Sequence, residues 1–231
     1  MKKKSGFIAA LLLSLALLGG CSSSDGGGLV QTASVLPENG KTAIVSAEGS
    51  VFAANYFAEA PTSAEDCSAK IQELIDKAAE TGGTVYLKSG TYRLSKPINL
   101  PDNVSLRGDF SSPNTKSEST AAETVLVALN TEENRAGAII KVGNGCTVSG
   151  IKIWYENRKY SDDVGFGYAI SAARCQNITL ENISLPNCYK GIELTAAKNA
   201  TVRNVFITAF SEGIRIESAE GFTSLCDVSV S

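Results

Sequence analysis

Val148-Ser-Gly-Ile-Lys-Ile153 is a six-residue stretch that returns three more times along the chain. Each copy carries apolar residues at its first, fourth and sixth positions, and successive copies begin 32, 22 and 23 residues apart. Such a period leaves no room for a crossover helix, and short strands at a fixed period are typical of a solenoid. The later copies are Leu180–Leu185 (LENISL), Val202–Ile207 (VRNVFI) and Leu225–Val230 (LCDVSV).

A second series of short strands precedes these copies. Alternate residues of a strand point to opposite faces, so we expect Ile192, Leu194 and Ile214 to face a continuous core and Glu193 and Arg215 to face outward. Two or three strands in each period predict an all-β fold, a parallel β-helix with coils of about 22 residues. The second series comprises Ile140–Val142 (IKV), Ile170–Ala172 (ISA), Ile192–Leu194 (IEL) and Ile214–Ile216 (IRI).

Asparagine and glycine recur in step with the strands. Asn177 and Asn199 stand 22 residues apart, as do Asn182 and Asn204. Both residue types tolerate the left-handed αL conformation, which most residues avoid. We therefore expect a positive φ at these four positions and at the equivalent glycines, Gly145 and Gly221.

A helix is predicted ahead of the repeats, over residues 64–80. Ser63 and Asp66 resemble a capping box, and Gly82-Gly83 end the element. The apolar residues between them recur at helical spacing and form a single stripe, suited to covering an apolar surface. The stripe comprises Cys67, Ile71, Leu74, Ile75 and Ala78.

Composition excludes several classes of function. The 231 residues contain no histidine, which rules out Ser-His-Asp and Cys-His nucleophile arrangements and any zinc site that needs imidazole. A net charge of −3 is too balanced for a nucleic-acid-binding surface. Downstream of Cys21 the cysteines are five in number and lack CxxC spacing, so we expect mostly buried small hydrophobes. In an oxidising compartment, two of them could alternatively pair.

The N-terminus has the pattern of a secretory signal. Lys2, Lys3 and Lys4 precede an apolar run over 7–18, which is too short to span a bilayer. The ending Leu-Gly-Gly-Cys21 resembles the bacterial lipobox, which implies that residues 1–21 form a lipoprotein signal and that Cys21 carries lipid. An ordinary signal peptide is the alternative.

The segments that follow complete the expected organisation. Residues 22–28 read as a flexible tether, 29–60 as a lead-in and 61–231 as the solenoid. Ser22 after the lipid-bearing cysteine, by resemblance to Gram-negative lipoproteins, favours the outer membrane. We therefore expect a monomer at the outer membrane or cell surface, held to the membrane through the N-terminal lipid only.

Four stretches carry a resemblance to a known family. They are similar to the N-terminal pattern of the pectate-lyase superfamily, in the branch that contains rhamnogalacturonase- and epimerase-like proteins and polygalacturonase-type hydrolases. The resemblance implies a right-handed parallel β-helix over about residues 50–231, whose N-terminal end is capped by the helix at 64–80. It also implies a polysaccharide partner. The four stretches are Asp66–Ala78, Gly82–Leu87, Ser89–Tyr92 and Leu100–Asp109.

The family's hydrolytic residues are only partly present. In polygalacturonase-like enzymes an Asn-Thr-Asp and an Asp-Asp each precede a Gly-Ile strand, and those positions fall here on residues 188–190 and on Ser211-Glu212. Glycoside hydrolysis normally needs two carboxylates, and of these positions only Glu212 keeps one. The superfamily's lyases often use Arg or Lys as the base, and a cation or Ca²⁺ stabilises the enolate-like charge. The resemblance therefore makes Glu212, Lys190 and Arg215 the candidate catalytic residues.

Glu193 joins these three as a candidate for binding a sugar acid, because all four lie on two neighbouring coils. The alternative is that Glu193 and Arg215 form an ordinary ladder pair between stacked strands.

An inserted loop over 154–167 carries aromatic and acidic residues. Trp154, Tyr155 and Tyr168 are candidates for stacking on sugars; alternatively, the aromatic residues pack the loop onto the solenoid. Asp162 and Asp163 offer oxygen ligands for Ca²⁺, or else belong to a solvated loop.

Three functions fit these features. The first is a surface-anchored lyase or glycoside hydrolase acting on a uronate-rich polysaccharide such as pectin. The second is a non-catalytic carbohydrate-binding or adhesive β-helix, and the third is a truncated product without activity. Ser231 directly follows a strand, and a solenoid needs its end coils capped. We therefore expect the natural protein to continue beyond this residue.

Overall fold

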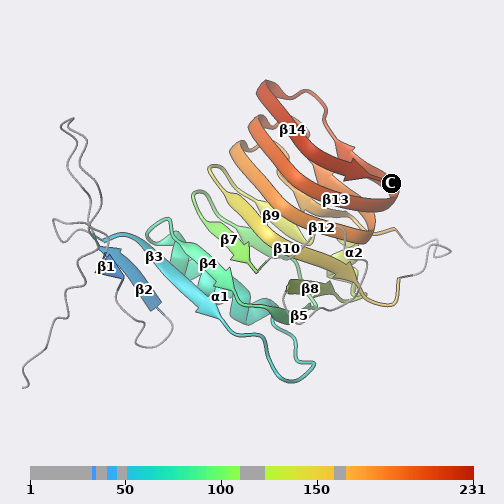
Figure 1. The fold of residues 1–231 in the computed structure, drawn as a ribbon. Helices are drawn as coiled ribbons and strands as arrows, with labels where there is room; N and C mark the ends of the chain where they lie inside the picture. Colours follow the sequence, from blue (N-terminus) through green and yellow to red (C-terminus); the bar gives the residue numbers. More distant parts are fainter. Residues whose placement is uncertain (1–32, 35–40, 46–50, 110–122, 159–164) are drawn as a thin grey trace, which may run out of the picture. The chain divides into compact units, whose positions relative to one another are not determined.

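The computed structural model describes residues 33–34, 41–45, 51–109, 123–158 and 165–231, all within one compact unit that spans Gln31–Ser231. These residues form a mostly β structure with parallel strands in a curled sheet (Figure 1). The predicted signal peptide with Cys21 and the tether over 22–28 lie outside the described residues. In the described part of the chain, no helix has the length and apolar character needed to span a membrane.

The described chain runs through fourteen strands and two helices. The two pairings among the first three strands, first with second and second with third, are antiparallel, and every other pairing is parallel. In order they are β1 Ala33–Ser34, β2 Lys41–Val45, β3 Val51–Ala58, α1 Ser68–Ala79, β4 Thr84–Leu87, β5 Gly90–Leu94, β6 Ile98–Leu100, β7 Ser105–Gly108, β8 Thr124–Ala128, α2 Glu132–Ala136, β9 Ile140–Val142, β10 Thr147–Tyr155, β11 Tyr168–Ser171, β12 Gln176–Glu193, β13 Lys198–Arg215 and β14 Glu220–Val230.

The four copies of the hexapeptide lie side by side in parallel register. Val148 pairs with Leu180, Leu180 with Val202, and Val202 with Leu225. The first three are fully buried, so the repeated apolar positions stack into one core. The second series stacks in the same way, as Ile98, Ile140, Ile170, Ile192 and Ile214 are successive partners.

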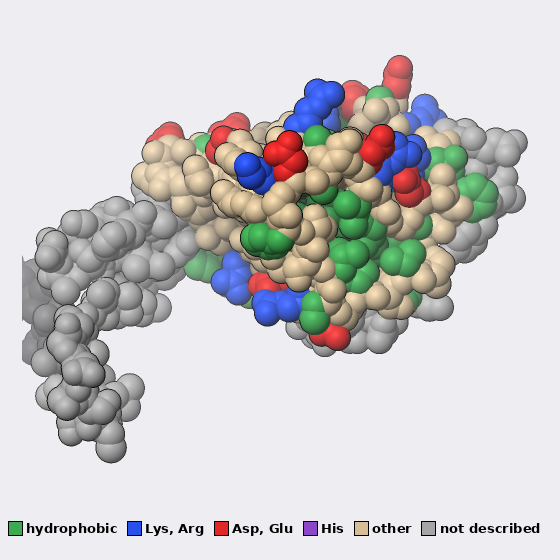
Figure 2. Space-filling view, turned by 90° about the horizontal axis from the view of Figure 1, so that it is seen from above, with side chains coloured by type: hydrophobic (Ala, Val, Ile, Leu, Met, Phe, Trp, Pro, Cys, Tyr) green, Lys and Arg blue, Asp and Glu red, His purple; other side chains and the backbone are tan. Residues whose placement is uncertain are grey.

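Burial falls off toward β14, which pairs with β13 alone among the described strands. Ile214, expected to face the core, is only partly buried, and Ile216 just after it is 44% exposed. Figure 2, which looks down on the molecule of Figure 1 from above, shows hydrophobic side chains gathered between charged ones. The exposed large hydrophobic residues of this region are Phe210, Ile216, Phe222, Leu225 and Val230.

The predicted αL positions are confirmed. Asn177, Asn182, Asn199 and Asn204 have φ between 50° and 58°, and the two equivalent glycines also have positive φ. The asparagine side chains stack as well as the backbone: Asn204 Nδ2 donates to Asn182 Oδ1 at 2.7 Å. Asparagine therefore has two roles at these positions: its backbone adopts the αL conformation, and its side chain bonds the asparagine one repeat away.

The predicted helix is present as α1 and begins later than expected, at Ser68. The N-cap residue is Cys67, and the side chain that bonds the first turn is Asp66, whose Oδ1 accepts from the Ser68 amide at 3.1 Å. Ile71, Ile75 and Ala78 are buried, which confirms the single apolar stripe. The helix contacts β3, β4 and β6.

One side chain of α1 also bonds the backbone of a strand. Gln72 Oε1 accepts from the Asn99 amide at 2.9 Å, and Gln72 Nε2 donates to the Asn99 carbonyl at 3.0 Å. Gln72 therefore satisfies one backbone amide and one backbone carbonyl of β6.

The described cysteines are all free, so the alternative of a disulfide is not formed. Cys67, Cys146 and Cys188 are buried and Cys175 is half-buried, as expected of small hydrophobes, whereas Cys226 on β14 is exposed.

Candidate functional site

Five side chains predicted for catalysis or recognition lie together on β11, β12 and β13. Tyr168, Lys190 and Glu212 are register partners on these strands, and Glu193 and Arg215 are partners three residues further along β12 and β13. Adjacent parallel strands lie about 4.8 Å apart, so residues one repeat apart in sequence become neighbours in space. These five residues are called the β11–β13 cluster.

Glu212 is the centre of the cluster. Its Oε2 accepts a hydrogen bond from Tyr168 Oη at 2.5 Å, and its Oε1 accepts from Arg215 Nε at 2.8 Å. The bond from Arg215 and the bond from Tyr168 hold the pKa of the Glu212 carboxyl below its usual value of 4.5. Glu212 is therefore ionised at neutral pH, where it can accept a proton but has none to donate.

The neighbours of Glu212 have fixed protonation states as well. Burial and the bond to Glu212 raise the pKa of Tyr168 well above its usual value, so its hydroxyl keeps its proton at neutral pH. Lys190 Nζ lies 5.3 Å from the centroid of the Tyr168 ring, a cation–π distance. The cluster therefore combines two basic side chains, two carboxylates, of which Glu212 is held ionised, and a protonated phenol.

Glu193 has hydrogen-bond partners of its own. It accepts from Ser171 Oγ at 2.7 Å and from Thr195 Oγ1 at 3.4 Å. Arg215 is its register partner but forms its ion pairs with Glu212, at 2.8 Å, and Glu217, at 3.9 Å. The simple Glu193–Arg215 ladder pair is therefore replaced by the Arg215–Glu212 bond within β13, and the half-buried Glu193 is held by Ser171 and Thr195 instead.

The aromatic residues of the inserted segment divide between the core and the surface. Tyr155 is fully buried and packs edge-on against Phe166, with ring centroids 4.9 Å apart, which corrects the expectation that it stacks on a sugar. The reason is strand alternation, since Tyr155 follows the inward-facing Ile153 by two positions on β10. Trp154 is half-buried on β10, beside Val127 of β8.

An aromatic pair that the sequence did not suggest lies in the same strands as the cluster. Tyr189 on β12 and Phe210 on β13 stack with ring centroids 5.7 Å apart, and Phe210 is 50% exposed. Lys190 directly follows Tyr189 in the sequence, and Glu212 comes two positions after Phe210. The signal that could have found them is the repeat itself, which places residues about 22 positions apart side by side.

Metal ligands are not gathered in the described part of the chain: it holds no group of three or more His, Cys, Asp or Glu side chains able to bind an ion. Asp162 and Asp163, the residues predicted for Ca²⁺, lie outside the described residues.

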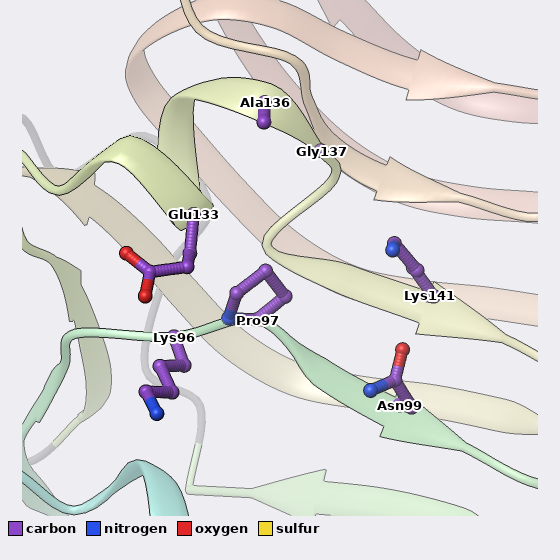
Figure 3. A pocket seen from close by; sticks show the side chains of 7 residues that line it. All are labelled: Lys96, Pro97, Asn99, Glu133, Ala136, Gly137 and Lys141. Carbon is purple, nitrogen blue, oxygen red and sulfur yellow. The ribbon is translucent and has the colours of Figure 1, made fainter.

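A cavity of about 420 Å³ opens on the same sheet as the cluster, nearer the N-terminus (Figure 3). Two lysines, one carboxylate and one amide line it, together with small apolar groups. The sequence analysis missed it because its walls come from three separate elements. The lining residues are Lys96, Pro97, Asn99, Glu133, Ala136, Gly137 and Lys141.

Comparison with known proteins gives one family. No curated protein and no solved structure matches the chain. Residues 54–141 match the family described as rhamnogalacturonase A/epimerase, pectate lyase-like. This segment runs from β3 to β9 and so precedes the β11–β13 cluster. Over this segment the chain is similar to pectate lyase-like proteins, a similarity that suggests a function related to polysaccharides.

Proposed function

We propose that this chain acts on a uronate-rich polysaccharide such as pectin, at the outer membrane or cell surface, where a lipid on Cys21 anchors it. The observation that carries the proposal is the β11–β13 cluster. Lys190 and Arg215 supply positive charge that suits a sugar carboxylate, and Glu193 and Tyr168 supply groups for hydrogen bonds to hydroxyls. The aromatic pair of Tyr189 and Phe210 borders these residues, and the guanidinium of Arg158 lies 5.3 Å and 5.6 Å from the two ring centroids, which adds a third cation near the cluster.

Of the two cleavage reactions, the cluster favours elimination over hydrolysis. Hydrolysis needs a protonated carboxylic acid to donate to the leaving oxygen, and the lowered pKa of Glu212 removes that proton. Elimination instead needs a base close to a cation that neutralises the carboxylate of the uronate. An ionised Glu212 beside Arg215 and Lys190 meets both needs.

The proposed step balances within the cluster. Glu212 takes the proton on the carbon next to the uronate carboxylate, and the electron pair of that C–H bond forms a carbon–carbon double bond. The bond from the adjacent carbon to the bridging oxygen breaks, and that oxygen takes the proton of Tyr168. The proton on Glu212 then returns to Tyr168 along their existing hydrogen bond.

The second candidate is a carbohydrate-binding or adhesive protein without catalysis. The favouring observation is that Glu212 already accepts bonds from two partners, which makes it a weaker base. In that case the five residues bind the polymer and no bond breaks.

Two readouts separate these candidates. The full chain is incubated with polygalacturonate, pectin and alginate, with and without Ca²⁺, while unsaturated product absorbance and reducing ends are followed. We expect both signals to rise together, and Glu212→Gln to abolish them. Glu220→Gln, on an exposed residue that pairs with Lys198, is the matched control. Reducing ends alone would show hydrolysis, and polymer binding without either signal would show the second candidate.

The finer description of the fold is also part of the proposal. Register partners 22 and 23 residues apart support a β-helix with coils of that length, and its right-handed sense follows the usual hand of crossovers between parallel strands. The bonds from Gln72 to the Asn99 backbone support α1 as the cap over its N-terminal end. A cap of this kind covers a strand edge that would otherwise be open to another chain.

A further inference from the structure

The cavity lined by Lys96 and Lys141 shares a sheet with the β11–β13 cluster. Asn99 of β6, Lys141 of β9, Ser171 of β11, Glu193 of β12 and Arg215 of β13 are successive register partners. Each follows a partner in the isoleucine column of the core, so all five occupy outward positions. At about 4.8 Å for each strand spacing, the column from Asn99 to Arg215 is about 19 Å long, and Lys141 of the cavity lies two spacings, about 10 Å, from Glu193 of the cluster.

Charge in the cavity is unbalanced toward the positive. Lys96 and Lys141 are exposed, and within the described part of the chain neither ammonium group forms an ion pair. Glu133 is the one carboxylate of the lining. Two cations against one anion attract a negatively charged ligand.

The remaining lining groups suit a sugar ring. Figure 3 shows Glu133 and Lys96 at one end of the cavity, Lys141 and Asn99 at the other, and the ring of Pro97 between them. An apolar ring can lie against the C–H face of a sugar, while Glu133 and Asn99 bond its hydroxyls. The volume of about 420 Å³ falls within the usual range for small-molecule sites.

The loop between α2 and β9 is packed so that Lys141 reaches the cavity. A Cβ placed on Gly137 would lie 3.5 Å from Lys141 Nζ, so the ammonium rests close above this glycine. The amide of Ile139, in this loop, donates to the carbonyl of Tyr168 at 3.0 Å, and this bond ties the loop to β11. The cavity wall is therefore joined to the strand that carries Tyr168.

We propose that this cavity is a second carbohydrate site, a subsite that binds the carboxylate of a uronate residue several units from the one held by the β11–β13 cluster. Lys141 pairs with the carboxylate, Lys96 at the opposite end of the cavity attracts a neighbouring carboxylate of the polymer, Pro97 lies against the ring, and the polymer follows the outward column between the two places. The inference rests on the proposed function, because it takes the same polymer as its ligand.

Calorimetric titration of the full chain tests the subsite. The ligands are a de-esterified galacturonate oligomer long enough to span the column and its methyl ester, which is the neutral control. The titrations use the native chain and the Glu212→Gln variant, in which we expect the oligomer not to be cleaved during the measurement. We expect Lys96→Ala and Lys141→Ala each to weaken binding of the charged oligomer about two- to fivefold, and about tenfold together. Lys198→Ala, on a lysine outside the cavity, leaves the affinity unchanged.

The subsite and the proposed function fail in different ways. Binding of the charged oligomer that stays within twofold of the parent in the double lysine variant overturns the subsite, and so does the absence of any binding. Product formation by the native chain reports separately on the cluster. If the native chain cleaves the polymer but the lysine variants bind it normally, the proposed function holds and the subsite does not. If the lysine variants bind more weakly but the native chain cleaves nothing, the subsite holds and the proposed cleavage does not.

Discussion

Glu212 accepts bonds from a cation and from a neutral hydroxyl, and both bonds favour its ionised form. Since its pKa is lower in the folded chain than in the unfolded one, its ionisation stabilises the fold above the unfolded value. That contribution is lost as the pH falls through the lower, folded pKa. We therefore expect the stability of the native chain to fall on acidification below 4.5, and to fall less in Glu212→Gln.

Urea unfolding at neutral pH and at a pH below the folded pKa measures this difference. Glu220→Gln serves as the comparison, because that exposed carboxylate lies 4.0 Å from its lysine partner. An acid-induced loss in Glu212→Gln equal to that of the native chain would contradict the role given to Arg215 and Tyr168.

Lys152 and Glu123 form an ion pair in which both side chains are at most 3% exposed. Removing one partner of a buried pair leaves a charge without compensation in the core, which typically costs about 3–5 kcal/mol. We expect Lys152→Met to lower the free energy of unfolding by about this amount. Combining it with Glu123→Leu should recover most of the loss, as measured by chemical denaturation. A single variant as stable as the native chain would show that the pair is solvated.

At the scale of one element, α1 contributes a side chain to the hydrogen bonding of β6. Gln72→Ala removes both bonds to Asn99, and an ordinary hydrogen bond contributes about 0.5–1.5 kcal/mol net. Because both bonds are solvent-exposed, we expect a loss near the lower end, about 1 kcal/mol in total. The amide of Asn99 should also exchange with deuterium faster in Gln72→Ala. Lys70→Ala, on an exposed residue of the same helix, should leave that exchange rate unchanged.

For the whole molecule, the prediction to test is the lipid anchor proposed on Cys21. If Cys21 carries lipid, cells fed labelled palmitate will label the native protein, and Cys21→Ser will remain unlabelled. The variant should also move from the membrane fraction to the soluble fraction, because one residue supplies the whole attachment. Labelling that persists in Cys21→Ser would place the lipid elsewhere.

The repeat explains how much of this could be predicted from sequence. Residues at equal places in successive periods become neighbours, so the pairing of Lys190 with Glu212 followed from counting along the chain. The αL asparagines followed in the same way.

Features that depend on pairs outside the repeat could not be found by counting. Glu123 lies 29 residues before Lys152 and belongs to no copy of the hexapeptide, so no pattern in the sequence predicted their ion pair. The cavity combines β6, α2 and β9 at places that the period does not relate. Tyr155 was misassigned because residues 154–167 were interpreted as an inserted loop, whereas β10 continues through Tyr155 and keeps the inward alternation of Ile151 and Ile153.

The ladder of outward side chains also works as a ruler. Groups on this face can stand only at whole multiples of the strand spacing, about 4.8 Å. Inserting one complete repeat between β9 and β12 would move the Lys141 cavity away from Glu193 by one strand spacing, and deleting one would bring it closer by the same distance. Neither change would alter the interior of the cavity or of the cluster. The reach of the protein along a polymer is therefore adjustable in steps, and gene duplication of a single repeat is enough to make one step.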